Sequence, residues 1–187
     1  AFFFLYLAGY AVQSTWPFYG MLKFDWTESM VGLSLGIVGV VVAIVQGLMV
    51  KHTLRWWGEK KTIFIGYVSW FVGLLLFAFV NQSWLLFASV LPYCFGGIAT
   101  PTLQSIVSNK FKDNEQGELQ GALTSLISLT AVLGPIIMTS IFAYFTQDGF
   151  EYFFPGAPFV LAAGFIALSF VITRAAMGNK EIESSTA

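Results

Sequence analysis

Long apolar stretches alternate with short polar segments along the whole chain. Each stretch has about twenty mostly apolar residues, the length that a helix needs to cross the hydrocarbon core of a bilayer. Because backbone groups cannot stay unpaired in lipid, each stretch should be a helix. The six predicted spans are residues 2–22, 31–50, 62–80, 84–107, 119–145 and 154–173.

Composition supports the same interpretation. Hydrophobic residues make up 57% of the 187 positions and charged residues only 10%, with a mean hydropathy of +0.75. Soluble domains carry roughly a quarter charged residues. The sequence therefore predicts an all-α, integral membrane six-helix bundle in contact with the lipid bilayer. A net charge of −1 gives no reason to expect a nucleic-acid partner, and Cys94, the only cysteine, cannot form an internal disulfide.

The basic residues predict the orientation in the membrane. With six spans, alternate connecting segments face the same side, and Lys/Arg-rich short loops lie on the cytoplasmic side. One side holds only Lys23. The other side holds Lys51, Arg55, Lys60, Lys61, Lys110, Lys112, Arg174 and Lys180. We therefore expect a multi-pass protein of the cell (inner) membrane, with both ends of this segment cytoplasmic and residues 174–187 as a cytoplasmic tail.

Four of the six spans carry polar and small residues on one helical face, whereas the third and sixth are almost uniformly apolar. Helices that line a wet cavity need a polar face, so we place the first, second, fourth and fifth spans around a cavity and the other two outside. The candidate lining residues are Tyr10, Gln13, Ser14, Gln46, Tyr93, Thr100, Gln104, Thr124 and Ser128. Hydrogen bonding between helices, side-chain packing and capping of backbone carbonyls are the alternative roles for these residues.

Glycine and proline mark positions for close packing or bending. Gly117 and Gly121 lie four residues apart, a spacing that lets helix backbones approach each other. The fifth span contains Gly134 and Pro135, and the fourth contains Pro92 and Pro101. A proline in the middle of a helix removes a hydrogen bond and bends the helix. These bends suit a protein that opens and closes, although packing kinks without function are the alternative.

The polar segment 108–118 is short and highly charged. Asp113 is predicted to cap the fifth helix, with Gln116 as its capping-box partner. Its Lys110, Lys112 and Asp113, with Lys60 and Lys61 of the other basic loop, form either a cytoplasmic gate or a solvated loop. No metal-ligand cluster, nucleophile–base set or phosphate-binding loop occurs in the sequence, so we expect no enzyme activity, no cofactor and no metal.

Several motifs match one family in order and with similar spacing. The sequence resembles the C-terminal half of tetracycline-efflux-type transporters, in the drug:proton antiporter branch of the major facilitator superfamily. The segments that carry the resemblance are residues 24–27 (FDWT), 31–35 (VGLSL), 56–61 (WWGEKK), 97–104 (GIATPTLQ), 116–121 (QGELQG), 128–130 (SLT) and 134–135 (GP).

The resemblance implies twelve helices in two six-helix halves, of which this chain would be helices seven to twelve. A missing N-terminal half of the same polypeptide would then be its partner, and the substrate site would lie near the midplane between the halves. Gln46 matches a family glutamine. Trp70 stands where tetracycline pumps carry an acidic residue, and Val42 where some carry a histidine, so the spans hold no ionisable proton carrier.

The functional hypothesis is a secondary transporter that exports small amphipathic organic molecules by alternating access, with protons as the coupling ion. An importer of sugars or metabolites on the same fold is one alternative. A self-contained six-helix membrane scaffold or pore is another.

Overall fold

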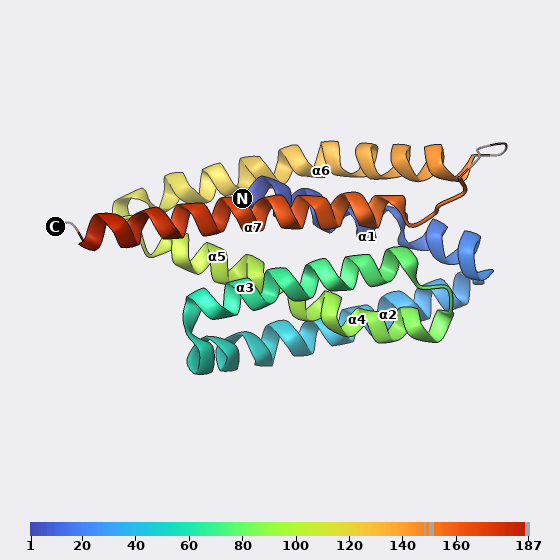
Figure 1. Cartoon of the computed structure of the whole chain (residues 1–187), viewed down its shortest axis with the longest axis horizontal. Coiled ribbons are helices and arrows are strands. Elements are labelled where there is room, and N and C mark those ends of the chain that lie inside the picture. The colour runs from blue at the N-terminus through green and yellow to red at the C-terminus, as the bar shows by residue number, and fades with distance from the viewer. Residues whose placement is uncertain (148, 150–151, 186–187) are drawn as a thin grey trace.

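Seven α-helices build the molecule, and no strand occurs in the part of the chain that the structure describes (Figure 1). The structure is a computed structural model that describes residues 1–147, 149 and 152–185. The helices are α1 (Phe2–Phe24), α2 (Glu28–Ile44), α3 (Val50–Phe79), α4 (Ser83–Gly96), α5 (Ala99–Ser108), α6 (Gln116–Thr146) and α7 (Ala157–Ser185), with a π-helical turn at Val45–Met49 and a 3₁₀ turn at Asp113–Glu115.

The connection between α2 and α3 is almost entirely helical, whereas the sequence predicted a connector over residues 51–61. Gly58 is the residue inside α3 with non-helical backbone angles, φ 71° and ψ 170°. Only glycine adopts this combination readily, because it has no Cβ. The chain reverses there, so α2 and α3 run antiparallel (Figure 1). The reversal therefore lies inside the predicted connector, and the residues on both sides of Gly58 are helical.

The fourth apolar stretch forms two helices. Between α4 and α5, the N–H groups of Gly97 and Ile98 donate to carbonyls three residues back, Cys94 at 3.0 Å and Phe95 at 3.2 Å. Pro101 has no N–H with which to continue the α-helical ladder. The break therefore lies close to Pro101, one of the two positions in this span at which a bend was predicted, and α5 takes a different direction from α4.

The turn before α6 differs from the predicted capping box. Asp113 lies in the 3₁₀ turn, and the Glu115 carboxylate accepts the Lys112 backbone N–H at 3.1 Å. The Gln116 side chain instead donates to the Ser108 carbonyl at 2.8 Å. An amide can donate as well as accept, so Gln116 ties the end of α5 to the start of α6.

The core forms where α3 packs against α4 and α7, and where α1 packs against α6 and α7. At the end of the bundle opposite Gly58, the Trp16 indole N–H donates to Ser34 at 2.9 Å and that of Trp26 donates to Ser83 at 3.1 Å. The Trp16 ring also packs edge-on against Phe77, 5.0 Å between centroids. These contacts join α1, α2, α3 and α4 at this end.

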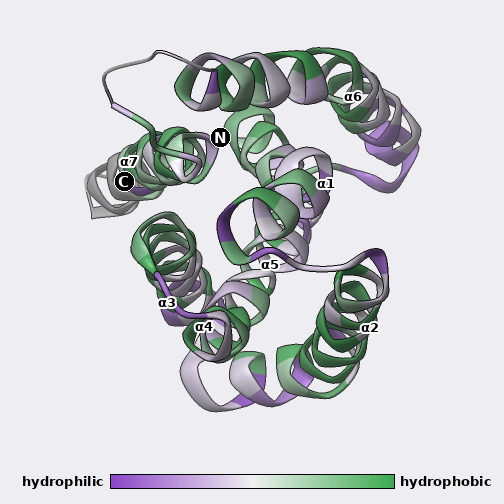
Figure 2. Cartoon of the chain, turned by 90° about the vertical axis from the view of Figure 1, so that its right-hand side faces the viewer, coloured by the Kyte–Doolittle hydropathy of each residue, from purple (hydrophilic) through white to green (hydrophobic). Residues whose placement is uncertain are grey.

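The outer surface of the bundle is apolar. Leu33 and Val40 on α2, Val68 on α3 and Val132 on α6 are each more than half exposed, and Figure 2 shows hydrophobic residues along the outer faces of these helices. By length and composition, four helical segments of the described chain can cross a membrane, and the first of them contains the reversal at Gly58. The molecule is an all-α, multi-pass membrane bundle of six rods, with α4 and α5 forming one rod.

Charged residues gather at the two ends of the rods. The α2–α3 reversal and the α5–α6 connection lie at the same end of the bundle as the C-terminus (Figure 1). Lys23, at the end of α1, lies at the opposite end. The basic residues predicted to share one side of the membrane therefore share one end of the structure.

Candidate functional site

A cavity of about 510 Å³ lies among α1, α2, α3, α4, α5 and α6. Its volume is in the range typical of small-molecule sites, about 300–1,000 Å³. Helix α7 contributes no residue to its lining. Figure 2 shows the arrangement end-on, with α1 and α5 between α2 on one side and α3 and α7 on the other.

Six of the nine candidate residues line this cavity. They come from α1, the π-helical turn, α4 and α5, which correspond to the first, second and fourth predicted spans. The six are Tyr10, Gln13, Gln46, Tyr93, Thr100 and Gln104.

The other three candidates lie elsewhere. Ser14 is half-buried beside Gln13, and Thr124 and Ser128 are exposed on α6. Helix α6 contributes Ile127 to the lining. Thr124 and Ser128 therefore flank the cavity edge without lining it in this chain.

Local backbone features position the polar side chains. Gln46 lies in the π-helical turn, where one extra residue per turn changes the direction of the side chain. Thr100 and Gln104 belong to α5, whose direction is set by the break at Gly97. A Cβ at Gly97 would lie 3.5 Å from the Gln46 side-chain nitrogen, so the two segments approach each other closely where both line the cavity.

Tyr10 is held by a glycine of α6. A Cβ at Gly134 would lie 2.6 Å from two carbons of the Tyr10 ring, closer than any ordinary contact. Gly134 was predicted as a kink or packing residue, and here it makes room for a cavity side chain. Pro135 lies inside α6, which continues past it.

The remaining predicted packing glycines do not pack within this chain. A Cβ at Gly117 or Gly121 would meet no described atom within 4 Å, and the same holds for Gly32, Gly36 and Gly39 on α2. The glycine faces of α2 and α6 are thus uncovered in this part of the molecule.

Trp70 was not among the predicted lining residues. It lies on α3, in the span that composition placed outside the cavity, yet it lines the cavity and is only 8% exposed. Gly96 of α4 packs directly on its backbone. Its indole N–H has no hydrogen-bond partner among the described groups. The signal in the sequence was a ring with a polar edge in a span otherwise rich in aliphatic residues and phenylalanine, a feature that Trp70 shares in that span only with Tyr67.

The lining has no Asp, Glu, Lys, Arg or His side chain. Within the described residues, no group of three or more His, Cys, Asp or Glu could hold a metal ion. The cavity instead offers amides, phenols, a threonine hydroxyl and aromatic rings. It is suited to hydrogen bonding and stacking with a polar aromatic molecule rather than to acid–base or metal chemistry.

The predicted gate residues lie at the basic end of the bundle, away from the cavity lining. Lys60 and Lys61 are exposed near the start of α3 beyond Gly58, and Lys110, Lys112 and Asp113 are exposed between α5 and α6. Their positions are compatible with either a gate or a solvated loop.

Comparison with known proteins identifies close sequence relatives. The profile of the Major Facilitator Superfamily matches residues 1–186. The chain is 36% identical over 142 residues to the tetracycline resistance protein, class C, of Escherichia coli, covering 76% of this chain and 36% of that protein. It is 30% identical over 181 residues to the class B protein of the same organism, covering 96% of this chain and 45% of that protein.

A solved structure has the same fold. The crystal structure of the human organic anion transporter MFSD10 (TETRAN) matches with a TM-score of 0.75 at 22% identity, over 91% of this chain and 38% of that chain. The chain thus spans less than half the length of the curated relatives and of the structure it matches.

Proposed function

The chain belongs to the major facilitator superfamily, and we propose that it forms the C-terminal six-helix half of a secondary transporter that exports small amphipathic organic molecules. The observation that carries this proposal is the cavity, because three amides, three phenols and a threonine hydroxyl from α1, the π-helical turn, α4 and α5 converge there within a membrane bundle. The proposal assigns the chain no enzymatic step, cofactor or metal.

A missing N-terminal half would complete the site. In such transporters the substrate site lies near the bilayer midplane between two repeats that rock against each other. The uncovered glycine faces of α2 and α6 support this partner, because small residues allow close, sliding contact between helices. Gly117 and Gly121 would then pack against the other half.

Proton coupling would depend on groups outside this lining. An intramembrane carrier of protons is normally an ionisable side chain, and the cavity lining of this chain has none. We therefore place the coupling residues in the missing half. Lys110, Lys112 and Asp113 would contact that half at the cytoplasmic end, whereas Lys60 and Lys61 would stay in the solvated loop. The transporter would lie in the inner membrane, with both ends of this segment in the cytoplasm.

The cargo would be a polar aromatic compound. Tetracycline, which occurs in the names of the relatives, is the first compound to test, although the resemblance puts Trp70 at a position where those pumps carry an acidic residue. The organic anions named for the structural relative are less well matched, because the lining offers no lysine or arginine to an anionic group. Import of sugars or metabolites remains the alternative on the same fold.

Transport by the full-length parent tests the proposal. We expect proteoliposomes containing the parent to move tetracycline or a fluorescent aromatic cation against its gradient when a proton gradient is imposed. Flux that is unchanged when the proton gradient is collapsed would remove the antiport mechanism. Absence of flux for every aromatic compound, with uptake of a sugar instead, would favour the importer.

A further inference from the structure

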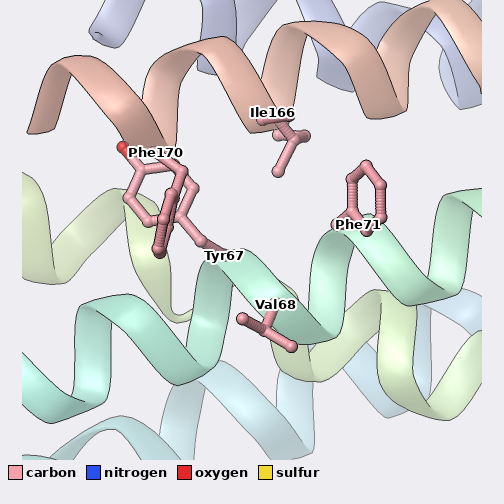
Figure 3. A pocket seen from close by; sticks show the side chains of 6 residues that line it. Tyr67, Val68, Phe71, Ile166 and Phe170 are labelled. Atoms are coloured by element: carbon pink, nitrogen blue, oxygen red, sulfur yellow. The ribbon is translucent and has the colours of Figure 1, made fainter. Parts of the chain in front are cut away.

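A second, smaller hollow lies on the outside of the bundle, between α3 and α7 (Figure 3). It has a volume of about 190 Å³. Its lining consists of Tyr67, Val68, Phe71, Ile166, Ala167 and Phe170. We call it the α3–α7 groove.

The only polar side chain in this groove is already engaged. The Tyr67 hydroxyl lies 2.9 Å from the hydroxyl of Ser169 and 2.9 Å from that of Thr173, both on α7. These bonds tie the two helices together below the groove and leave it with an apolar surface. An occupant of the groove should therefore be hydrocarbon.

The groove faces away from the central cavity and shares no lining residue with it. Val68 at its edge is 55% exposed, and Val171 beside it on α7 is 59% exposed. In a multi-pass membrane protein such a surface contacts lipid. The groove is also smaller than the roughly 300 Å³ at which small-molecule sites begin, so it fits a segment of an acyl chain better than a whole folded molecule.

Basic side chains lie at one end of the groove. Arg174 is four residues beyond Phe170, and Lys60 is seven residues before Tyr67, so each shares a helix face with a lining residue. Lys61 follows Lys60, and all three are exposed. Because Tyr67 pairs with Thr173 across antiparallel helices, Arg174 lies level with residue 66 of α3. Lys61 and Lys60 are five and six residues further toward the same end, about 8–9 Å along the axis, a distance that the long Arg and Lys side chains can bridge.

We propose that the α3–α7 groove binds one acyl chain of an anionic glycerophospholipid whose phosphate lies against Arg174, Lys60 and Lys61. Anionic lipids are attracted to basic side chains at the membrane surface, whereas a zwitterionic headgroup carries its own cation and gains less. The bound lipid would cover the groove and strengthen the pairing of α3 with α7. The proposal depends on the membrane location of the chain and not on the transport function.

The test compares two lipids that differ only in the headgroup. The purified full-length parent is titrated in detergent with dioleoylphosphatidylglycerol or dioleoylphosphatidylcholine, and retained lipid is counted by native mass spectrometry. We expect tighter retention of phosphatidylglycerol. Because each cation near an anionic surface is worth about fivefold in affinity, the triple variant Lys60→Gln, Lys61→Gln, Arg174→Gln should lose at least about tenfold.

A second variant tests the groove itself. Ala167→Trp fills the hollow from an exposed position without removing core packing, and it should also lower phosphatidylglycerol affinity. Val171→Trp adds the same bulk to the same helix outside the lining and should leave the affinity unchanged.

Three outcomes would overturn the proposal. The first is loss of affinity in the charge variant but not in Ala167→Trp, which would mean that the headgroup binds the basic surface alone. The second is full competition by soluble glycerol phosphate, which would show that no acyl chain takes part. The third is a dimer cross-linked through α3 and α7, with the groove closed by a second copy.

Discussion

Replacing Gly96 by alanine should force α3 and α4 apart. A Cβ at Gly96 would lie 2.5 Å from the Trp70 Cα and closer still to the Trp70 Cβ, whereas ordinary contacts begin at 3.4 Å, so one helix must move by at least about 0.9 Å (3.4 − 2.5). The obstructing atoms belong to the backbone, which cannot rotate away as a side-chain tip can. Overpacking of this kind costs about 1–3 kcal/mol.

The variant is measured as a change in Tm of the full-length parent in lipid nanodiscs, followed by intrinsic tryptophan fluorescence. A loss of 1 kcal/mol lowers Tm by roughly 2–4 °C in a domain of this size, so a cost of about 1–3 kcal/mol should lower the Tm of Gly96→Ala by roughly 2–12 °C. The same change displaces Trp70, so cargo affinity should fall with it. Gly164→Ala is the matched control, because Gly164 is helical and exposed with no atom within 4 Å of the added Cβ. Equal Tm values for the two variants would refute the close α3–α4 contact.

Three further substitutions test other contacts. Gly134→Ala would place a Cβ 2.6 Å from the Tyr10 ring and 2.7 Å from the Tyr10 Cβ, which cannot rotate away, so α1 and α6 must move apart. Both Tm and cargo affinity should fall, and unchanged values of both would argue against the close contact of Gly134 with Tyr10. Tyr67→Phe removes a hydroxyl with two partners on α7. The loss should lower the stability by about 0.6–2 kcal/mol, measured as a fall in Tm. Tyr152→Phe, at an exposed position, is the control and should leave Tm unchanged; equal Tm values for the two variants would count against the buried pairing. Gly58→Ala places a Cβ on a residue with φ 71° and ψ 170°, a backbone conformation that costs about 1–3 kcal/mol for a residue other than glycine. The yield of folded parent, measured by size-exclusion chromatography, should therefore fall. A normal yield would contradict the sharp reversal.

The number and type of the rods were predictable because the bilayer imposes a simple rule on length and polarity. The polar faces were predictable for a similar reason, since amides such as Gln13 and Gln104 are unfavourable in hydrocarbon. Polar residues spaced three or four positions apart lie on the same face of a helix, so their spacing indicates which face is polar. This is why six lining residues could be named before any geometry was known.

Backbone irregularities were not accessible in the same way. The π-helical turn at Gln46 and the helical path up to Gly58 are features of the backbone, which the spacing of polar and apolar residues does not report. Trp70 was missed because the third span was judged by its overall apolar composition. One side chain, that of Trp70 at the contact with Gly96, is enough to bring this helix into the cavity lining. Asp113 illustrates a further limit, because several neighbouring acids and amides could each cap the same helix and only the fold selects among them.

The central claim is that the polar faces of these helices line water and the apolar faces contact lipid. The direct test is thiol labelling of the full-length parent in native membranes, with Cys94 and any other native cysteine replaced by serine. Gln13→Cys and Gln104→Cys should react with a small water-soluble thiol reagent and be protected by cargo, while Val68→Cys and Val171→Cys should not react. Labelling of the cysteines at the two valine positions, together with no labelling of the cysteines at the two glutamine positions, would contradict the account.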